Sequence, residues 1–234
     1  MKSEDPDVFL VQETKAQPEQ IDLAAFEEAG YHPVIHSAGK KGYSGVGVFS
    51  KMKPDRHFVG MGIDEYDAEG RVLRVDLGEL TILSTYFPTR TSGSIRQDFK
   101  MKFLEDFSVY AQDLLQSRPM TVISGDYNIC HRPIDIHNPV ANKNSSGFLP
   151  EERDWFSGFL EKGFVDSFRH CHGDVPNKYS WWTYRQRARS RNLGWRIDYH
   201  LVSRDLQHAV RGADIHSDVV HSDHCPVSIQ IELN

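Results

Sequence analysis

The chain has 234 residues, of which 39% are hydrophobic and 26% are charged. This length and composition suit one compact domain spanning residues 1–234 and exclude an extended disordered protein. No stretch approaches the roughly 18 apolar residues that a membrane-spanning helix needs, and residues 1–7 lack the apolar core of a signal peptide. We therefore expect a cytoplasmic protein with no membrane partner.

The net charge of −6 argues mildly against a nucleic-acid partner, because phosphate binding needs positive surface. Arginines nevertheless crowd one short stretch, at Arg185, Arg187, Arg189, Arg191 and Arg196. From charge alone a solvated arginine-rich loop is favoured, although an acidic pocket rimmed by arginine would give the same pattern. The three cysteines show no CxxC spacing, so we expect reduced, partly buried side chains and neither disulfides nor a zinc site.

Apolar runs in the first third of the chain predict strands around one helix. Val8–Val11 is short and unalternating, which predicts a buried strand that ends just before Glu13. Pro18–Ala29 predicts a helix, because proline suits its start and Gly30 suits its end. Glycines and charged turns separate further predicted strands at Tyr31–His36, Gly45–Ser50, Arg71–Leu77 and Thr81–Phe87.

The rest of the chain predicts two longer helices and three strands. Ile95–Leu115 is amphipathic, with aromatic residues recurring every four positions, and predicts a long helix. After it we expect a buried strand at Met120–Ser124, a loop at Arg132–Pro150, a helix at Glu151–Lys162, and strands at Ile197–Val202 and Val227–Ile231. Strands outnumber helices and follow one another like hairpins, which favours a four-layer α/β sandwich of two packed mixed β-sheets flanked by helices.

Four short segments share one layout, in which an apolar strand runs into acids, amides or histidine. They are VFLVQE with Glu13, TVISGDYN with Asp126 and Asn128, GWRIDY with Asp198, and HSDHCPV with Asp223 and His224. Each one alone is more often a turn or a helix cap than a catalytic group. Four such edges together predict one convergent acidic pocket, because rigid scaffolds place function in the loops at sheet edges.

Carboxylates gathered without cysteine suit a hard cation with oxygen ligands, Mg²⁺ or Mn²⁺. Glu13 is the leading candidate ligand and Asp223 the second. Such an ion would neutralise developing charge on a phosphate and anchor the leaving oxygen. The pattern therefore predicts metal-assisted chemistry on a phosphate ester.

The remaining polar groups supply the proton transfers that such a reaction needs. Asp126 is the candidate base for an attacking water, and Asn128 would position the water or a phosphate oxygen. His224 would contact the scissile phosphate or handle a proton, while Asp198 holds its imidazole in one tautomer. In-line phosphoryl transfer needs mainly positioning and electrostatic stabilisation, so these residues are sufficient for the reaction.

An aromatic-rich segment, YSWWTY, precedes the arginine cluster and Trp195. Aromatic residues interleaved with arginine suit stacking on sugar or base faces and contact with phosphates. The alternative is core packing. We expect it for Trp182, because Trp181 and Trp182 would face opposite ways on a strand.

The motifs VQETK, YFP, GDYN, IDIHNP, GFLPEER, YSWWTY, GWRIDY and SDHCPV, in this order from about Asp7 onward, resemble the exodeoxyribonuclease III family of abasic-site endonucleases. GDxN and SDH alone would indicate only the endonuclease/exonuclease/phosphatase superfamily, with its DNase I-like fold. GFLPEER and GWRIDY narrow the resemblance to its DNA-repair branch. The resemblance implies hydrolysis of the phosphodiester 5′ to abasic sites, with 3′–5′ exonuclease and 3′-phosphodiesterase activity. It further implies a monomer that acts on double-stranded DNA with abasic sites or blocked 3′ ends, and that is nucleoid-associated if bacterial.

The resemblance also implies roles for individual residues. Glu13 matches the family's metal-binding glutamate, and Tyr86 matches the tyrosine that contacts the scissile phosphate. Asp126 and Asn128 match the pair that orients the attacking water. Asp223 and His224 match the family's last Asp-His pair, and Asp198 matches the carboxylate that supports this histidine. The pocket for a flipped abasic sugar matches Trp181, Trp195 and Ile197, whose apolar walls would leave no room for a base. DNA-contacting positions match Asn138, Asn142 and Arg191. Whether Asp126 or His224 takes the proton of the water is left open.

Two departures from the family pattern accompany the resemblance. Thr89 follows YFP where relatives usually carry Asn or Gln. Relatives begin with a strand carrying an Asn-x-x-Gly-type motif and then a helix, and Met1 is expected to fall inside that helix, so the family's first strand is expected to be missing. Two alternatives follow: a catalytically impaired DNA-binding relative, or a phosphatase or phosphodiesterase of the same superfamily. The tandem tryptophans, the arginine cluster and GFLPEER argue against the phosphatase.

Overall fold

The structure is a computed structural model that describes residues 4–89 and 93–233. The chain divides into two compact units: unit 1 is Met1–Phe87 with Leu114–Asp126, and unit 2 is Pro88–Asp113 with Tyr127–Asn234. A single domain over residues 1–234 stays a prediction. Whether Met1 lies in a helix falls outside the described residues. No helix in the described ranges is long and apolar enough to cross a membrane.

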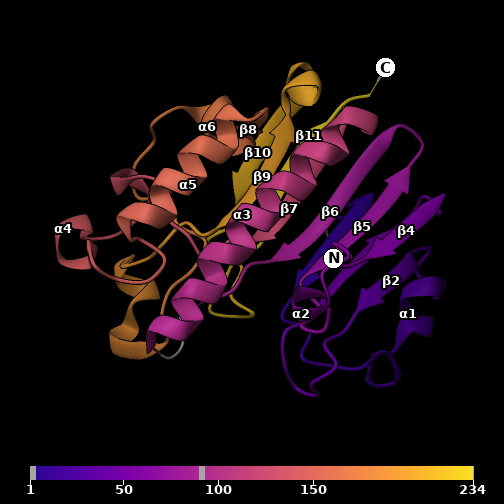
Figure 1. Cartoon of the computed structure of the whole chain (residues 1–234), viewed down its shortest axis with the longest axis horizontal. Coiled ribbons are helices and arrows are strands. Elements are labelled where there is room, and N and C mark those ends of the chain that lie inside the picture. The colour runs from indigo at the N-terminus through magenta and orange to yellow at the C-terminus, as the bar shows by residue number, and fades with distance from the viewer. Residues whose placement is uncertain (1–3, 90–92, 234) are drawn as a thin grey trace. The chain divides into compact units, whose positions relative to one another are not determined.

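Unit 1 consists of two packed sheets, drawn in indigo to magenta in Figure 1. Its strands are β1 (Val8–Gln12), β2 (His32–His36), β3 (Val46–Ser50), β4 (Arg56–Val59), β5 (Val72–Leu77), β6 (Leu80–Tyr86) and β7 (Thr121–Asp126). The first sheet has the order β1-β3-β2 and is antiparallel. In the second, β4, β5 and β6 are antiparallel neighbours, whereas β6 and β7 are parallel. The first sheet packs on β5, β6 and β7.

The packing of the sheets in unit 1 decides which strands are buried. Every residue of β3 is buried, because this strand lies between β1 and β2 and faces the second sheet. The expectation that Val8–Val11 is buried is wrong, since each residue of β1 is only partly covered. The reason is that β1 is the edge strand of its sheet and, among the described residues, pairs with β3 alone.

The helix predicted at Pro18–Ala29 is broken into two pieces. A 3₁₀ turn, η1 (Pro18–Gln20), precedes α1 (Leu23–Glu28). The break arises because the carboxylate of Asp22 accepts a hydrogen bond from the backbone N–H of Ala25 at 3.2 Å and so caps a new helix. β4 and α2 (Asp64–Asp67) were not predicted, because both are too short to show a hydrophobic period.

Unit 2 packs helices beside two antiparallel strand pairs, β8–β9 and β10–β11. Its strands are β8 (Phe164–Asp166), β9 (Asp198–Ser203), β10 (Val210–Ile215) and β11 (Val227–Ile231). Its helices are α3 (Gly93–Ser117, up to Asp113 in this unit), α4 (Pro139–Asn142), α5 (Pro150–Glu161) and α6 (Ser167–His172). The 3₁₀ turns are η2 (Pro133–Asp135), η3 (Arg185–Arg187), η4 (Arg189–Arg191) and η5 (Arg204–Ala209).

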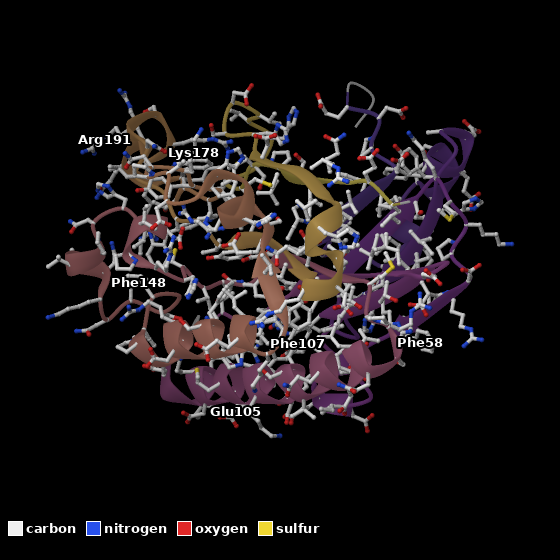
Figure 2. All side chains as sticks on the ribbon, turned by 90° about the horizontal axis from the view of Figure 1, so that it is seen from above. Phe58, Glu105, Phe107, Phe148, Lys178 and Arg191 are labelled. Atoms are coloured by element: carbon white, nitrogen blue, oxygen red, sulfur yellow. The ribbon has the colours of Figure 1, made fainter. Side chains whose placement is uncertain are left out.

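Helices α3 and α5 lie side by side and share an aromatic core (Figure 1). The rings of Phe107 and Phe159 are 5.8 Å apart, and Nε1 of Trp155 donates to the carbonyl oxygen of Leu104 at 2.9 Å. Figure 2 shows Phe107 and Glu105 on opposite sides of α3, with Glu105 outermost. This arrangement confirms the amphipathic helix predicted at Ile95–Leu115.

Several elements of unit 2 differ from the expectations. β8, α6 and β10 were not predicted, and the loop predicted at Arg132–Pro150 contains η2 and α4. Cys130 and Cys225 are buried, but Cys171 is exposed, contrary to the expectation for it, because it lies on the short surface helix α6. All three thiols are free, as expected.

Candidate active site

Two strand ends in unit 1 carry a tyrosine and an aspartate side by side. Tyr86 is the last residue of β6 and Asp126 the last residue of β7, and the parallel register pairs these two positions. Both side chains are nearly buried, at 7% and 3% exposure. The parallel pairing thus brings a phenol and a carboxylate to the same edge of the sheet.

Glu13 completes this group from the loop that follows β1. Its backbone has a φ of 51°, a left-handed conformation that the chain adopts as it leaves the strand. The hydroxyl of Tyr86 donates a hydrogen bond to the carboxylate of Glu13. Burial, together with the negative charges of Glu13 and Asp126, raises the pKa of Tyr86 far above its usual range. Tyr86 therefore stays protonated and can act as a hydrogen-bond donor.

Gly125 allows the two strand ends to approach each other this closely. Its φ is 151°, a conformation that L side chains rarely adopt. A Cβ atom at this position would lie 1.8 Å from the carbonyl oxygen of Thr85 on β6. The glycine of the GDYN motif is therefore a requirement of strand spacing next to Asp126.

Arg71 packs against Tyr86 and was not among the predicted site residues. Its side chain is 2% exposed, and its guanidinium lies 5.0 Å from the centroid of the Tyr86 ring. Nη1 donates to the Tyr86 carbonyl oxygen at 3.0 Å, and Nη2 donates to the hydroxyl of Tyr43 at 2.9 Å. Nothing in its sequence context distinguishes it from a surface arginine, because its burial depends on partners far along the chain.

The donor set of unit 1 suits a hard cation. Glu13 and Asp126 offer carboxylate oxygens, and the Glu13 side chain is 33% exposed. Nζ of Lys15 stands 2.5 Å from Oε2 of Glu13, which shows that a positive charge is favourable at this carboxylate. The Lys15 side chain is 58% exposed, so a cation can displace it into solvent.

In unit 2 His224 meets Asp198, the carboxylate that was predicted to hold its imidazole. Nδ1 of His224 lies 2.9 Å from Oδ2 of Asp198, with side-chain exposures of 26% and 11%. Oγ of Ser180 accepts the backbone N–H of Asp198 at 3.1 Å and fixes the start of β9. The expected contact of Asp198 with the His224 imidazole is therefore present in the structure.

The placement of this pair relative to its strands is opposite to the expectation. Asp198 is the first residue of β9, and Asp223 and His224 precede β11, so these two strands run away from the acids. The error has a simple cause: a short apolar run has no direction in sequence, so either of its ends can carry the polar group.

The three apolar pocket candidates lie together in unit 2. Trp181 and Trp195 pack against a cluster that contains Ile197. The remaining members of this cluster are Cys130, Ile136 and Phe148. The two indole rings meet edge to face at 5.8 Å. Trp182 belongs to a different cluster and is 2% exposed, which confirms the expectation of core packing for it.

Asp223 lies against this aromatic cluster. Its Oδ2 accepts a hydrogen bond from Nε1 of Trp181 at 3.0 Å, and its Oδ1 accepts one from Ser222 at 3.1 Å. Protein donors therefore engage both of its oxygens, and its role as a metal ligand stays a prediction.

The three asparagines differ in what holds them. Asn128 follows β7 with a φ of 51°, and its carbonyl oxygen accepts from Nζ of Lys100 at 2.9 Å. Oδ1 of Asn138 accepts from the Ala141 N–H at 3.2 Å and caps α4, while Nδ2 of Asn142 donates to the carbonyl oxygen of Asn138 at 3.0 Å. The last two amides thus shape their own loop, and their contact with DNA stays a prediction.

The arginine cluster is divided between the core and the surface. Arg196 is 1% exposed and forms ion pairs with Asp135 and Asp166. Arg189 donates to the carbonyl oxygen of Ser222 at 2.7 Å and covers the Trp182 ring at 4.6 Å. The exposed members are Arg185, Arg187 and Arg191, and Figure 2 shows Arg191 at the outer margin of its loop.

Comparison with known proteins places these features in a class. Residues 1–224 match the endonuclease/exonuclease/phosphatase family, and the chain therefore belongs to that family. An exodeoxyribonuclease of Bacillus subtilis is 44% identical over 233 residues, which cover 100% of this chain and 91% of that protein. A DNA-(apurinic or apyrimidinic site) endonuclease of Dictyostelium discoideum is 40% identical over 237 residues, covering 100% of this chain and 65% of that protein.

Solved structures agree with this assignment. An AP endonuclease from Archaeoglobus fulgidus matches with a TM-score of 0.89 at 30% identity, over 99% of this chain and 91% of that chain. The 3′–5′ exonuclease NExo from Neisseria meningitidis matches with a TM-score of 0.89 at 26% identity, over 97% and 90%. The expected α/β fold of packed mixed sheets and helices and the expected family are both confirmed.

Proposed function

We propose that this protein is a magnesium-dependent DNA-repair nuclease that hydrolyses the phosphodiester 5′ to an abasic site. 3′–5′ exonuclease and 3′-phosphodiesterase activities belong to the same proposal. The observation that carries it is the group formed by Glu13, Tyr86 and Asp126, in which the protonated phenol donates a hydrogen bond to Glu13 and its strand position is paired with Asp126. In such a group the carboxylates can bind a divalent cation, and the phenol can donate a hydrogen bond to a phosphate bound beside it. The names of the relatives, an exodeoxyribonuclease and an abasic-site endonuclease, support the choice of substrate.

Individual residues have proposed roles in the hydrolysis of the phosphodiester. Asp126 is the proposed base for the attacking water, and Asn128, two residues along the chain, orients that water or a phosphate oxygen. The Tyr86 hydroxyl donates to a phosphate oxygen. Nε2 of His224, with Nδ1 engaged by Asp198, contacts the scissile phosphate.

Glu13 is the proposed holder of the cation, with Asp223 as the second candidate. A bound Mg²⁺ supplies charge neutralisation on the phosphate and on the leaving oxygen, and Mn²⁺ can substitute for it. Two observations support this assignment. Glu13 offers carboxylate oxygens, and the ammonium group of Lys15 that pairs with them is exposed, so a cation can replace it.

Selectivity for abasic sites is proposed to come from Trp181, Trp195 and Ile197. An abasic nucleotide has less stacking to lose when it leaves the helix, so its extrusion is easier than that of a normal nucleotide. The packed aromatic cluster favours a deoxyribose over a nucleotide with its base attached. Asn138, Asn142 and Arg191 are proposed to contact the DNA strand. A cytoplasmic monomer acting on double-stranded DNA completes the proposal.

One assay tests the function. The protein is incubated with a labelled duplex that carries a single tetrahydrofuran abasic analogue, with Mg²⁺ and, in parallel, with EDTA. Incision 5′ to the lesion in the magnesium arm alone supports the proposal. Tight binding without incision in either arm would instead indicate a DNA-binding relative that does not turn over. Release of phosphate from a phosphoinositide without cleavage of DNA would indicate a phosphatase of the same family.

A further inference from the structure

A fully buried ion pair in unit 2 connects the two long helices of that unit. Nζ of Lys100 on α3 lies 2.7 Å from Oε1 of Glu152 on α5, and both side chains are 0% exposed. Lysine and glutamate are almost never fully buried unless they are paired. A buried pair adds little stability compared with apolar residues of the same volume, so its contribution must be sought in geometry.

Glu152 uses its second oxygen to hold a loop. Oε2 accepts hydrogen bonds from the backbone N–H groups of Gly147 at 2.6 Å and Leu149 at 3.0 Å. The residue thereby caps the start of α5 and fixes the segment just before it. Because Oε1 faces Lys100, one carboxylate connects the helix α3 to the Gly147 loop.

Lys100 makes a further hydrogen bond to the loop that follows β7. Its Nζ donates to the carbonyl oxygen of Asn128 at 2.9 Å. Asn128 has a φ of 51°, a left-handed conformation that is uncommon outside glycine, although asparagine tolerates it better than most residues. A charged donor held in place by Glu152 is suited to impose it.

Gly147 brings the same network to the aromatic cluster. A Cβ atom on Gly147 would lie 3.0 Å from the carbonyl oxygen of Asn128 and 3.0 Å from Cζ3 of Trp195. The Gly147 backbone therefore packs against both residues, and Glu152 sets its position through the hydrogen bond to its N–H.

We propose that Lys100 is a positioning residue, which with Glu152 sets the orientation of Asn128 relative to Trp195. The inference rests on the proposed function, in which Asn128 orients the attacking water or the phosphate. Lys100 itself contacts no substrate in this scheme. Loss of its ammonium group lets the Asn128 backbone relax, and a catalytic group that shifts by about 1 Å loses roughly two orders of magnitude in rate.

The test compares Lys100→Met with Lys102→Met, the same substitution at an exposed position of the same helix. Each variant is assayed on the abasic duplex with Mg²⁺, and the side-chain amide of Asn128 is followed by ¹⁵N NMR. We expect Lys100→Met to lower kcat by roughly 10- to 100-fold with KM within about threefold, and to shift the Asn128 resonance. Lys102→Met is expected to match the parent protein. An unchanged kcat and an unshifted Asn128 in Lys100→Met would overturn the inference.

Two further variants separate positioning from a general loss of stability. If Lys100→Met does not fold, the double variant Lys100→Met with Glu152→Gln removes both charges, and it should fold with the same loss of kcat. Phe159→Leu perturbs the same helix pair away from Asn128, and it should lower Tm but keep kcat. An equal loss of kcat in Phe159→Leu would contradict the inference. A parent protein that does not cut DNA refutes the proposed function, and the Asn128 resonance alone then decides the positioning role.

Discussion

His224 presents Nδ1 to Oδ2 of Asp198 at 2.9 Å. A carboxylate can only accept a hydrogen bond, so Nδ1 carries the hydrogen and Nε2 points its lone pair or its second proton elsewhere. The histidine is thus held in one tautomer, with 26% of its side chain exposed, on the segment that precedes β11.

Replacement of Asp198 by Asn is expected to disrupt this arrangement without changing the shape of the side chain. The amide can donate to Nδ1, which favours the wrong tautomer, so kcat should fall by roughly 10² or more. The pH–rate profile should change shape as well. Asp205→Asn, an exposed position in the same unit, is the matched control. Normal turnover in Asp198→Asn would remove the histidine from the proposed reaction.

Asp126→Asn tests the proposed base. The isosteric amide cannot take a proton, so incision should be abolished, while the affinity for the abasic duplex stays nearly intact. Affinity is measured by fluorescence anisotropy in Ca²⁺ and cleavage in Mg²⁺. Asp113→Asn on α3 serves as the control. A large loss of affinity in Asp126→Asn would contradict the assigned role.

Arg191→Ala tests the contact with the DNA backbone. The side chain is exposed, so its removal should leave Tm unchanged, weaken binding, and reduce the slope of log K against log salt by about 1. Arg211→Ala removes another exposed arginine, which pairs with Glu232, and should leave the slope unaltered. A slope that is equal in the parent and in Arg191→Ala would exclude a phosphate contact.

Arg196→Met tests the opposite role within the same arginine cluster. This substitution leaves the buried carboxylates of Asp135 and Asp166 without their shared partner, and should lower the free energy of unfolding by about 3–5 kcal/mol. Urea unfolding followed by tryptophan fluorescence measures this change, with Arg191→Met as the control. A loss below about 1 kcal/mol would show that Arg169 alone compensates Asp135.

His131 predicts a pH dependence of stability. Burial lowers its pKa to about 4, below its ordinary value of 6.5, so the folded state binds the proton less readily than the unfolded chain. The contribution of neutral His131 to the free energy of unfolding is complete above pH 6.5. As the pH drops from 6.5 to 4, this contribution falls by about 2 kcal/mol, after allowance for partial exposure.

The His131→Gln variant isolates this contribution, because glutamine can still reach Ser157, to which Nε2 of the histidine lies at 2.8 Å, but does not titrate. Thermal unfolding at pH 7.5 and pH 4.5 should show a smaller difference for the variant than for the parent. Equal differences in the two proteins would mean that other groups dominate acid destabilisation in this range.

Local pattern alone was enough to place Glu13 and Asp126 at strand ends. The strands before Glu13 and Asp126 show as short apolar runs, so the polar residues that follow or end them are visible in the sequence, whereas the role of Tyr86 came from the resemblance to the family. Direction was harder to assign: Asp198 begins its strand, and a short run gives no indication of which end faces the site. β10 was missed because its sequence, VRGADI, contains a glycine at a register shift that interrupts the alternation.

Buried charge was not predictable from local sequence. The burial of Lys100 and Arg71 was not predicted, and each contacts partners more than ten residues away along the chain. Local sequence reports propensity and periodicity, whereas these side chains are placed by tertiary contacts. The same reason explains why Arg196 was grouped with a surface cluster although it lies in the core.

The close approach of Gly125 to Thr85 limits how the GDYN motif can change. A methyl group at this position would meet the backbone of β6, and the strand cannot yield without carrying Tyr86 away from Asp126. The position of Asp126 therefore depends on Gly125, although only the aspartate has reactive atoms. Gly125 has no reactive side chain, yet a single added carbon at this position is enough to separate the phenol of Tyr86 from the carboxylate of Asp126.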